Sequence, residues 1–478
     1  MFTHMTISPF LKQCFVTATI CMNVLSNGAS YGFPAVLLPQ LKLPDSTIPI
    51  TKSEESWIAS VVTVAMLVGN LTMPLIMDVL GRRKATFLIM VPITVAWITM
   101  IFATNVQLIL FARVMQGLSF GQVVPIRAVI IGEYTSPKNR GAFLTTATVA
   151  QTIGIFLVHL LGSLMTWQST ALICLMFTAI SFVMTFFIPE SPSWLASKGR
   201  YEECKKHFRK LRGDGEEAEL NELIQARMEH NSKERSITFR SGLEIVRKVE
   251  FYMPILLFLH VTLMAYVAGG MNLAVYGTTI VSLIMGPDVD AHFWLVVIDV
   301  LRIVANIVAV YYMKMCLRRT VTFSTGGLCL LVHVAIVAYV ILVKNGIATY
   351  DWVWIPAVLL NLQCFAVSLG ILPITCVLAG EVFPLAYRSI GISVGMAIAT
   401  VFHFLILKTF PYLIPTVGIE GAYGIYACAI LYCLIVIYFT MPETKGRTLQ
   451  QIEDSMKGMG KQSKNSDNTK SPTPTCCI

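Results

Sequence analysis

The sequence predicts an all-α membrane protein whose twelve transmembrane helices form two pseudo-symmetric bundles of six. Of its 478 residues, 55% are hydrophobic and only 13% are charged, a composition too apolar for a soluble domain to cover its own surface. The charged residues gather between apolar runs of about 20 residues, the length that crosses a hydrocarbon core of about 30 Å. Several polar motifs also occur twice in the same order, which indicates a duplicated unit.

Twelve apolar segments account for most of the chain. The first begins near Phe10 and lacks a convincing cleavage site, so we interpret it as a retained span rather than a signal peptide. The predicted segments are 10–36, 57–80, 85–103, 107–132, 141–164, 169–188, 253–284, 292–315, 320–343, 352–380, 388–414 and 420–441.

The short segments that join these runs alternate in charge. One set is basic and includes Lys84, Lys138 and Arg319, whereas the other set is poor in Lys and Arg and includes Glu54 and Asp290. Because short cytoplasmic loops carry the excess of Lys and Arg in membrane proteins, the basic set is predicted to be cytoplasmic. An even number of spans then places both termini in the cytoplasm.

Residues 189–252 form a long polar stretch, dense in both signs of charge, between the two groups of spans. We expect short surface helices there, interrupted by a Gly-Asp-Gly turn. The predicted domains are a first bundle over 1–188, a cytoplasmic linker over 189–252, a second bundle over 253–441 and a cytoplasmic tail over 442–478. The tail is rich in Ser, Asn, Thr and Pro and is expected to be mostly disordered after about residue 455.

The duplication is clearest in a pair of Glu-Arg motifs. "GEYTSPKNRG" contains Glu133 and Arg140, and "GEVFPLAYRSIG" contains Glu381 and Arg388 at the same internal spacing, 248 residues later. "DVLGRRK" and "KMCLRRT" form a second pair, and "PESPSWL" and "PETKGRT" form a third. Three ordered motifs at a near-constant offset predict a duplicated six-span unit, with these motifs at the cytoplasmic ends of matching spans.

A carrier must close one face while it opens the other, so it needs contacts that form in one state and break in the other. Arg and Glu at the cytoplasmic ends can form charge-assisted bonds across the two halves. One exposed pair contributes only about 0–1 kcal/mol, so a network is required. An alternative is that the basic residues merely set topology, although topology does not require the acids. The predicted cytoplasmic gate comprises Asp78, Arg82, Arg83, Glu133, Arg140, Glu190, Arg318, Arg319, Glu381, Arg388 and Glu443.

These motifs resemble those of the sugar porters of the major facilitator superfamily, over residues 10–455. The likeness is carried by "DVLGRRK", "ARVMQGLSFGQ" with "GEYTSPKNRG", "PESPSWL", "GEVFPLAYRS" and "PETKGRTLQQIE", in the family's order. The first-span stretch "SYGFPAVLLPQL" is most similar to insect trehalose and glucose facilitators. The resemblance implies a plasma-membrane carrier, monomeric and without cofactor, metal or nucleic acid, that moves a hexose or a trehalose-like disaccharide by alternating access. The lipid bilayer is then its other partner.

The resemblance also implies where sugar binds. Gln151 in the fifth span and Asn272 in the seventh match positions that contact sugar in the family, and Tyr276 lies one helical turn beyond Asn272. An amide inside a membrane helix can instead bridge two helices. Gly117 and Gly121, four residues apart, predict that the fourth span packs closely on a neighbour.

Arg302 departs from the family, which places an asparagine at this position of the eighth span. It lies about 15 Å deep at a helical rise of about 1.5 Å per residue. An unpaired arginine at such depth costs at least about 2.5 kcal/mol. Asp299, three residues earlier, is the candidate partner. The second hypothesis is that Arg302 faces the pathway and binds an anionic or strongly hydrogen-bonding substrate.

Other departures leave three functions open. The family's paired glutamines are Tyr266 and Val267 here, and a tryptophan of the tenth span is Cys376. The hypotheses are a sugar carrier, a carrier of the same fold for a non-sugar and possibly anionic solute, and a sensor that does not transport. An enzyme is disfavoured because the chain has no phosphate-binding Gly-rich loop and no plausible metal cluster.

Proton coupling has little support in the sequence. The first-span stretch "SNGASYGF" has no carboxylate where proton–sugar symporters of the family place an aspartate, so we expect facilitated diffusion. Asp299 is the obvious midmembrane acid. Histidines 159, 260, 333 and 403 also lie within spans and either titrate or bridge helices.

Overall fold

The computed structural model describes residues 8–213, 216–232, 249–350, 352–383 and 388–445, and the secondary structure of these ranges is helical. The helices of the first half are α1 (Pro9–Gly32), α2 (Pro34–Leu41), α3 (Lys52–Leu80), α4 (Arg82–Ile101), α5 (Val106–Tyr134), α6 (Pro137–Leu164) and α7 (Trp167–Thr185). Three short helices follow: α8 (Pro192–Ser197), α9 (Tyr201–Arg212) and α10 (Glu217–Ser232). The second half contains α12 (Val249–Val267), α13 (Gly270–Met285), α14 (Ala291–Met315), α15 (Arg318–Lys344), α16 (Trp354–Ala366), the π-helix η2 (Val367–Ile371), α17 (Leu372–Glu381) and α18 (Arg388–Thr440).

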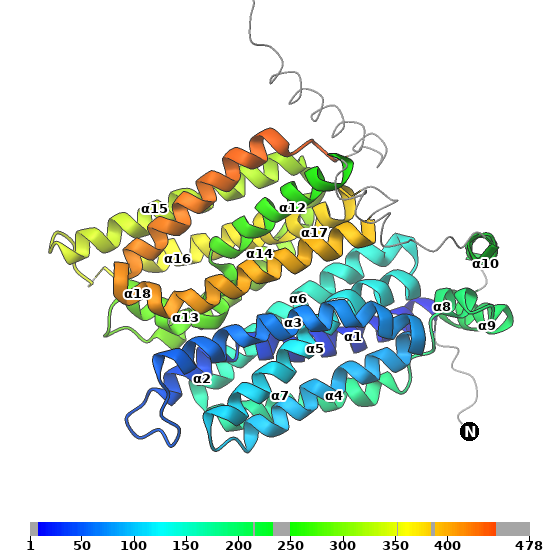
Figure 1. The fold of residues 1–478 in the computed structure, drawn as a ribbon, viewed down its shortest axis with the longest axis horizontal. Helices are drawn as coiled ribbons and strands as arrows, with labels where there is room; N and C mark the ends of the chain where they lie inside the picture. Colours follow the sequence, from blue (N-terminus) through cyan, green and yellow to red (C-terminus); the bar gives the residue numbers. More distant parts are fainter. Residues whose placement is uncertain (1–7, 214–215, 233–248, 351, 384–387, 446–478) are drawn as a thin grey trace, which may run out of the picture.

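The two halves lie side by side (Figure 1), with α1–α7 in the lower group and α12–α18 in the upper group. Helices α8–α10 lie together at one end of the molecule, which we call the linker end. The connection between α2 and α3 lies at the opposite end, which we call the far end. Helices α3 and α18, and helices α6 and α14, pack against each other across the boundary between the halves.

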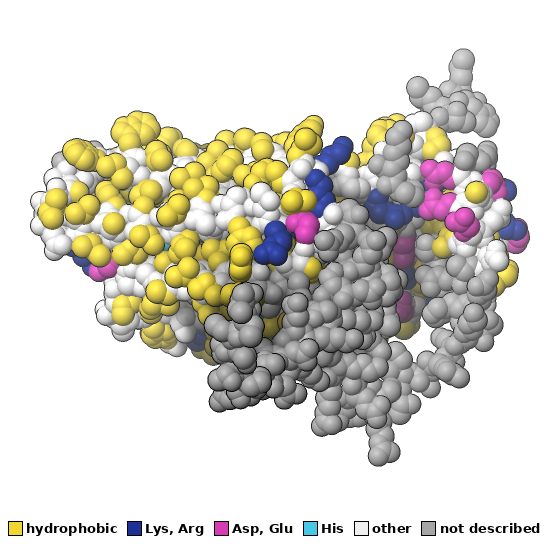
Figure 2. All heavy atoms as spheres, turned by 90° about the horizontal axis from the view of Figure 1, so that it is seen from above, with side chains coloured by type: hydrophobic (Ala, Val, Ile, Leu, Met, Phe, Trp, Pro, Cys, Tyr) yellow, Lys and Arg dark blue, Asp and Glu magenta, His cyan; other side chains and the backbone are white. Residues whose placement is uncertain are grey.

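Ten helical stretches in the described residues are long and apolar enough to cross a membrane. Helix α1 adds 24 residues, and the longest stretch, Gly391–Thr440, is divided by a kink at Gly418, where φ is 72°. These segments account for the twelve predicted passes. In Figure 2, hydrophobic side chains are spread over the part of the face away from α8–α10, and charged ones gather toward the end that carries α8–α10.

Three predicted spans are interrupted rather than continuous. The first ends at Gly32 and resumes at Pro34 as α2, because proline lacks the amide hydrogen that would continue the helix. The seventh breaks at Gly269, whose φ of 91° is left-handed. The carbonyl of Ala268 accepts a hydrogen bond from Gln363 Nε2 at 2.9 Å, so a side chain pairs this backbone group at the break. The tenth contains the π-helix η2 between α16 and α17.

Glycines allow α3 and α5 to approach closely, as the small-residue spacing predicted. A Cβ atom at Gly121 would lie 2.1 Å from the carbonyl oxygen of Met66, and one at Gly117 would lie 2.3 Å from that of Val62. Gly69 of α3 makes the reciprocal approach to Leu118, at 2.3 Å. The helices can hold this separation only while these positions carry no side chain.

Candidate functional site: charge clusters and the interface between the halves

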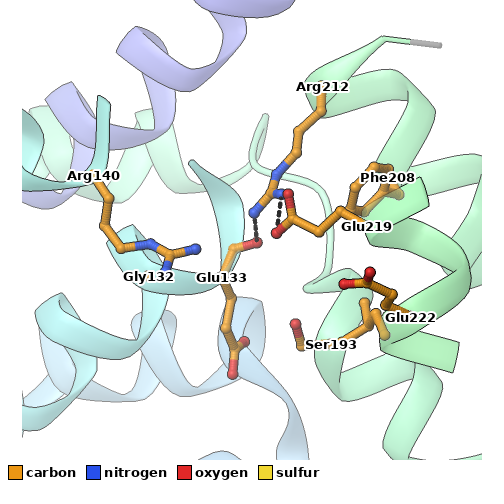
Figure 3. Close-up of a pocket in the computed structure, with 9 residues that line it drawn as sticks. Gly132, Glu133, Arg140, Ser193, Phe208, Arg212, Glu219 and Glu222 are labelled. Carbon is orange, nitrogen blue, oxygen red and sulfur yellow. Dashed lines mark hydrogen bonds and ion pairs between the residues drawn. The ribbon is translucent and has the colours of Figure 1, made fainter. Parts of the chain in front are cut away.

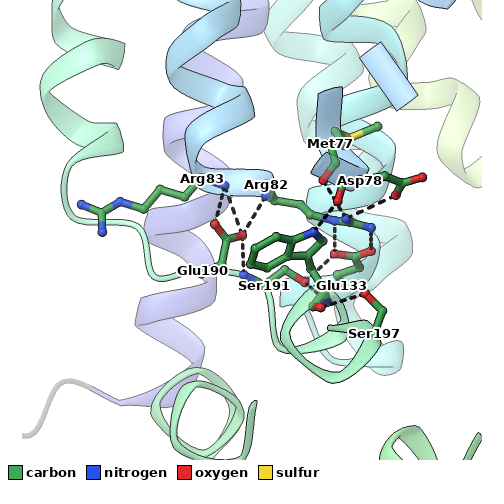
Figure 4. A network of polar contacts seen from close by, with 9 residues as sticks. Met77, Asp78, Arg82, Arg83, Glu133, Glu190, Ser191 and Ser197 are labelled. Atoms are coloured by element: carbon green, nitrogen blue, oxygen red, sulfur yellow. Dashed lines mark hydrogen bonds and ion pairs between the residues drawn. The ribbon is translucent and has the colours of Figure 1, made fainter. Parts of the chain in front are cut away.

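A cluster of charged residues joins four segments of the first half at the linker end (Figure 4). Arg82 donates to both carboxylate oxygens of Glu133, at 2.9 Å from Nε and 2.7 Å from Nη2. Glu190 accepts from the backbone amides of Arg82, at 2.7 Å, and Arg83, at 3.3 Å. Ser191 donates to Glu133 at 2.5 Å. The carboxylate of Glu190 thus caps the N-terminus of α4, where unpaired amides favour negative charge.

The second half repeats most of this cluster, although Arg318 Nε makes no hydrogen bond among the described residues. Arg318 Nη2 lies 3.2 Å from Glu381. Glu443 accepts from the backbone amides of Arg318 and Arg319 at 3.0 and 3.1 Å. Thr444 donates to Glu381 at 2.6 Å, as Ser191 does to Glu133. The guanidinium groups match too, because Arg82 donates to Met77 O and Arg318 donates to Met313 O.

Backbone hydrogen bonds tune the acid of the second cluster. Burial raises the pKa of the Glu443 carboxyl, but hydrogen bonds from the backbone amides of Lys445, Arg319, Arg318 and Thr444 outweigh it and hold the pKa below its ordinary value. The carboxylate is therefore charged at neutral pH.

The expectation that these residues bond across the two halves is wrong for this state. In the described parts of the chain, each ion pair and hydrogen bond recorded for the clusters joins groups of one half. Asp78 is mostly exposed and lies 3.8 Å from Arg82. The side chain of Arg388 lies outside the described residues. The clusters tie each half together internally at the linker end.

A pocket of about 250 Å³ adjoins the first cluster, between the end of α5, the start of α6 and helices α8–α10 (Figure 3). Arg212 of α9 pairs with Glu219 at 2.7 Å and donates to Thr135 O at 2.8 Å. These contacts bind α9 and α10 to the first half. Arg140 also borders the pocket, and its Nε is buried without a hydrogen-bond partner among the described residues.

Polar contacts between the two halves lie from the middle of the molecule toward the far end. Asn306 of α14 donates to Thr152 of α6 at 3.0 Å, midway along both helices. Tyr31 of α1 lies 2.9 Å from His403 of α18. Nearer the far end, Ser56 of α3 donates to the carbonyl of Lys408 of α18 at 2.6 Å.

Two further contacts join the halves near the far end. Thr278 of α13 donates to Ala35 O of α2 at 3.1 Å. The ammonium group of Lys408 lies 3.8 Å from the ring centroid of Trp57, a cation–π contact between the halves. The halves are therefore joined in the middle and at the far end.

The most deeply buried charges of the interface form a cluster that we call the buried triad: His159, Asp299 and Arg302. Asp299 is 0% exposed, and one carboxyl oxygen lies 2.5 Å from His159 Nδ1 while the other lies 3.0 Å from Arg302 Nη1. Arg302 Nε also donates to Cys364 Sγ at 3.4 Å. The predicted Asp299–Arg302 pair is present, and His159 extends it across the interface from α6 to α14.

The predicted sugar contacts are not brought together in this state. Gln151 accepts from Arg127 at 2.7 Å, within the first half. The hydroxyl of Tyr276 donates to Leu407 O at 3.0 Å, and its ring stacks on Phe410 with centroids 4.8 Å apart. Tyr276 is 1% exposed and fills the interior of the second half.

Asn272 lies in different surroundings. It sits beside Gln363, Tyr423 and Tyr426 inside the second half, where no space the size of a water molecule remains. Its side chain lies beside the Tyr426 hydroxyl, yet neither of its buried amide atoms makes a hydrogen bond of standard geometry. An unsatisfied buried amide costs about 1–3 kcal/mol, so Asn272 is poised to bind an incoming polar group.

The interface contacts were harder to predict than the clusters. Thr152, Asn306 and Ser56 stand in apolar segments without any repeated motif. His159 carried a signal, because a histidine within a span must find a polar partner, and the sequence did allow it to bridge helices. What the sequence could not show is which helix it would reach.

The fold and the two matching charge clusters define a multi-pass membrane carrier of the major facilitator type. The sequence model of the family described as "Sugar (and other) transporter" matches residues 10–455. The chain belongs to this family.

Known proteins similar to the chain agree with this placement. It is 27% identical to a facilitated trehalose transporter of Bombyx mori over 93% of this chain and 86% of the relative. It is 24% identical to one of Culex quinquefasciatus over 94% and 86%. Among solved structures, the inward-open xylose transporter XylE of E. coli matches with a TM-score of 0.74 at 15% identity, covering 92% of this chain and 98% of that one. At that identity the likeness shows the fold.

Proposed function

We propose that this chain carries a sugar across the plasma membrane by facilitated diffusion, through alternating access between its two halves. The linker end lies in the cytoplasm with both termini, as the basic residues of its loops favour, and the chain works as a monomer. The observation that carries the proposal is the uneven distribution of contacts. Polar bonds join the halves from the middle to the far end, whereas the linker-end charges pair within each half.

This distribution corresponds to one state of an alternating-access cycle, closed outside. To open outside, the carrier breaks the far-end bonds and brings the linker ends together. Arg140, with its unpaired Nε, and the carboxylate of Glu381 are then available to bond across the halves. Topology alone does not require the matched acids, which cap helices and pair with arginines within each half in this state.

The substrate is a sugar on the grounds of family membership and of the relatives named for trehalose. Gln151 from the first half and Asn272 from the second supply neutral donors and acceptors for hydroxyl groups. Tyr426, beside Asn272, offers an aromatic face. The space beside Asn272 is too small to hold even a water molecule, far below the usual 300–1,000 Å³ of ligand sites, so the site must open when sugar enters.

The hypothesis of an anionic substrate requires that the guanidinium group of Arg302 be unpaired. The guanidinium pairs with Asp299 and is 5% exposed, which leaves no unpaired positive charge for a substrate in this state. We therefore favour a structural role for Arg302. Uptake of sugars and of organic anions is compared between wild type and Arg302→Asn to test this role. If Arg302 binds substrate, the variant must change the selectivity between the two classes of solute.

Counterflow in proteoliposomes tests the proposed function. Purified protein is reconstituted with unlabelled glucose or trehalose inside, and labelled sugar is added outside. We expect transient accumulation of at least one sugar, and an Asn272→Leu variant with a KM raised severalfold. Folded protein that exchanges neither sugar would contradict the proposal and leave the non-sugar carrier and the sensor.

A further inference from the structure

The buried triad holds its histidine in surroundings that call for an extra proton. His159 Nδ1 lies 2.5 Å from the Asp299 carboxylate. Its Nε2 lies 3.2 Å from two carbonyl oxygens, those of Gly32 and Ala274. Both ring nitrogens therefore face acceptors. A neutral imidazole has only one N–H, so in either tautomer a lone pair would point at an acceptor.

The carbonyls stand where regular helix structure is interrupted. Helix α1 ends at Gly32, and α13 departs from helical dihedrals at Tyr276, two residues after Ala274. A Cβ at residue 32 would lie 3.0 Å from His159 Nε2, so glycine allows the imidazole to approach this backbone. Acceptors are thus presented to the ring from both halves.

One added proton satisfies both ring nitrogens of His159, whereas Asp299 Oδ1 and Arg302 Nη2 make no hydrogen bond of standard geometry among the described residues. As an imidazolium, His159 donates to Asp299 and to the two carbonyls. If the proton instead resides on Asp299, the acid donates to Nδ1 and Nε2–H donates to a carbonyl. Both forms carry one proton more than a neutral histidine beside an ionised aspartate. Since His159 is 1% and Asp299 0% exposed, that proton is shielded from water on either side.

We propose that the buried triad is a proton-binding site that stabilises the outside-closed state, so that external acid closes the carrier and external base favours opening. The inference rests on the alternating-access orientation proposed above. When the halves part at the far end, His159 loses Asp299 and Ala274 O and meets external water, so the arrangement that holds the extra proton is lost. The proton then leaves on the side from which it came.

The direction follows from proton counting. The closed state binds one proton more than the open state once the open state has released it, so closure takes up protons and rising pH shifts the balance toward opening. The shift approaches about tenfold per pH unit in the closed-to-open ratio. Because the site is shielded from the linker end, no net proton transport accompanies sugar, consistent with facilitated diffusion.

Other titratable and charged groups lie around the triad. Helix α14 also carries His292, which interacts electrostatically with His159. Helix α1 carries Tyr31, within range of Arg302 and of Arg113 from α5. Helix α16 contributes Cys364, whereas α2 has no titratable side chain. The hydroxyl of Tyr31 lies 2.9 Å from His403 Nε2.

The test is hydrogen–deuterium exchange of residues 291–306, measured by mass spectrometry on the full chain in lipid nanodiscs from pH 6 to 8.5, after correction for intrinsic exchange. We expect protection to fall with rising pH, by up to about tenfold per unit, and His159→Gln to remove that dependence. Asp299→Asn is the second variant and also removes it. His292→Gln, on the same helix, is the matched control and keeps it.

No pH dependence in the wild type, or a dependence that His159→Gln retains or His292→Gln removes, overturns the proposal.

Sugar uptake is measured in parallel at fixed internal pH, with a pH-sensitive dye inside the vesicles. We expect uptake at low sugar concentration to rise with external pH without a change in internal pH. Internal acidification driven by sugar overturns the proposal, because it requires access to the site from inside. If hydrogen–deuterium exchange depends on pH in a protein that does not transport sugar, the proton-site proposal is supported and the proposed substrate is contradicted.

Discussion

At the scale of residues, the structure decides between alternatives that the sequence left open. Arg302 had two possible roles, and its 3.0 Å contact with Asp299 inside the protein favours the structural one. The sequence predicted this pair because residues three apart share a helix face. It could not identify His159 as the third member, since residues 159 and 299 approach only through the packing of α6 on α14.

Removing one member of the buried triad is expected to destabilise the protein strongly. Arg302→Ala leaves the Asp299 carboxylate with less compensation, a loss of about 3–5 kcal/mol in the free energy of unfolding. The double variant Asp299→Asn with Arg302→Met removes both charges and is expected to recover most of that loss. Unfolding in detergent measures both, and an Arg302→Ala protein as stable as wild type would contradict the pair's structural role.

At the scale of elements, the repeated motifs predicted more than individual contacts. From the repeated motifs, Arg82, Glu133 and Glu190 were expected to match their counterparts in the second half. In the structure, each set forms a cluster, and the two clusters make corresponding bonds. The sequence did not predict that those bonds form within each half, because motif spacing contains no information about which partner a flexible arginine selects. The helix break at Gly269 was missed, since apolar composition continues through it, whereas the kink at Gly418 falls between the predicted spans 388–414 and 420–441.

The glycine contact between α3 and α5 gives an element-scale prediction. Gly121→Ala is expected to lower the free energy of unfolding by about 1–3 kcal/mol, because the new methyl group would meet the Met66 carbonyl and force the helices apart. Gly327→Ala in α15 is the matched control, as a Cβ there has nothing within 4 Å. Thermal unfolding compares them, and equal melting temperatures for the two variants would disprove the close-packing interpretation.

The helix caps give a second prediction at this scale. Glu190→Ala and Glu443→Ala each leave the first amides of a helix, α4 or α15, without their carboxylate. Each is expected to reduce stability by about 0.5–2 kcal/mol, and the double variant by the sum, because the caps lie in different halves. Unequal losses outside this range, or strong coupling in the double variant, would argue against two independent and equivalent clusters.

At the scale of the whole molecule, the sequence predicted the twelve passes and the duplication, and family membership follows from the same motifs. The sequence could not predict the conformational state. One sequence must encode both the outside-closed and the outside-open states, so the contacts of either state cannot be deduced from composition or spacing. Thr152 with Asn306 and Ser56 with Lys408 became visible only once the halves were placed together.

The most direct test of the central claim, that the halves must separate between the middle and the far end during transport, is a reversible cross-link. Thr152→Cys with Asn306→Cys joins α6 to α14 at side chains now 3.0 Å apart. Ser26→Cys with Thr178→Cys, at hydroxyls 2.6 Å apart within the first half, is the control. Mass spectrometry verifies each bond, and sugar uptake is measured before and after reduction. The account predicts that the pair between the halves abolishes uptake until it is reduced, while the control pair and each single variant transport normally. Undiminished uptake by a carrier fully cross-linked between its halves would contradict it.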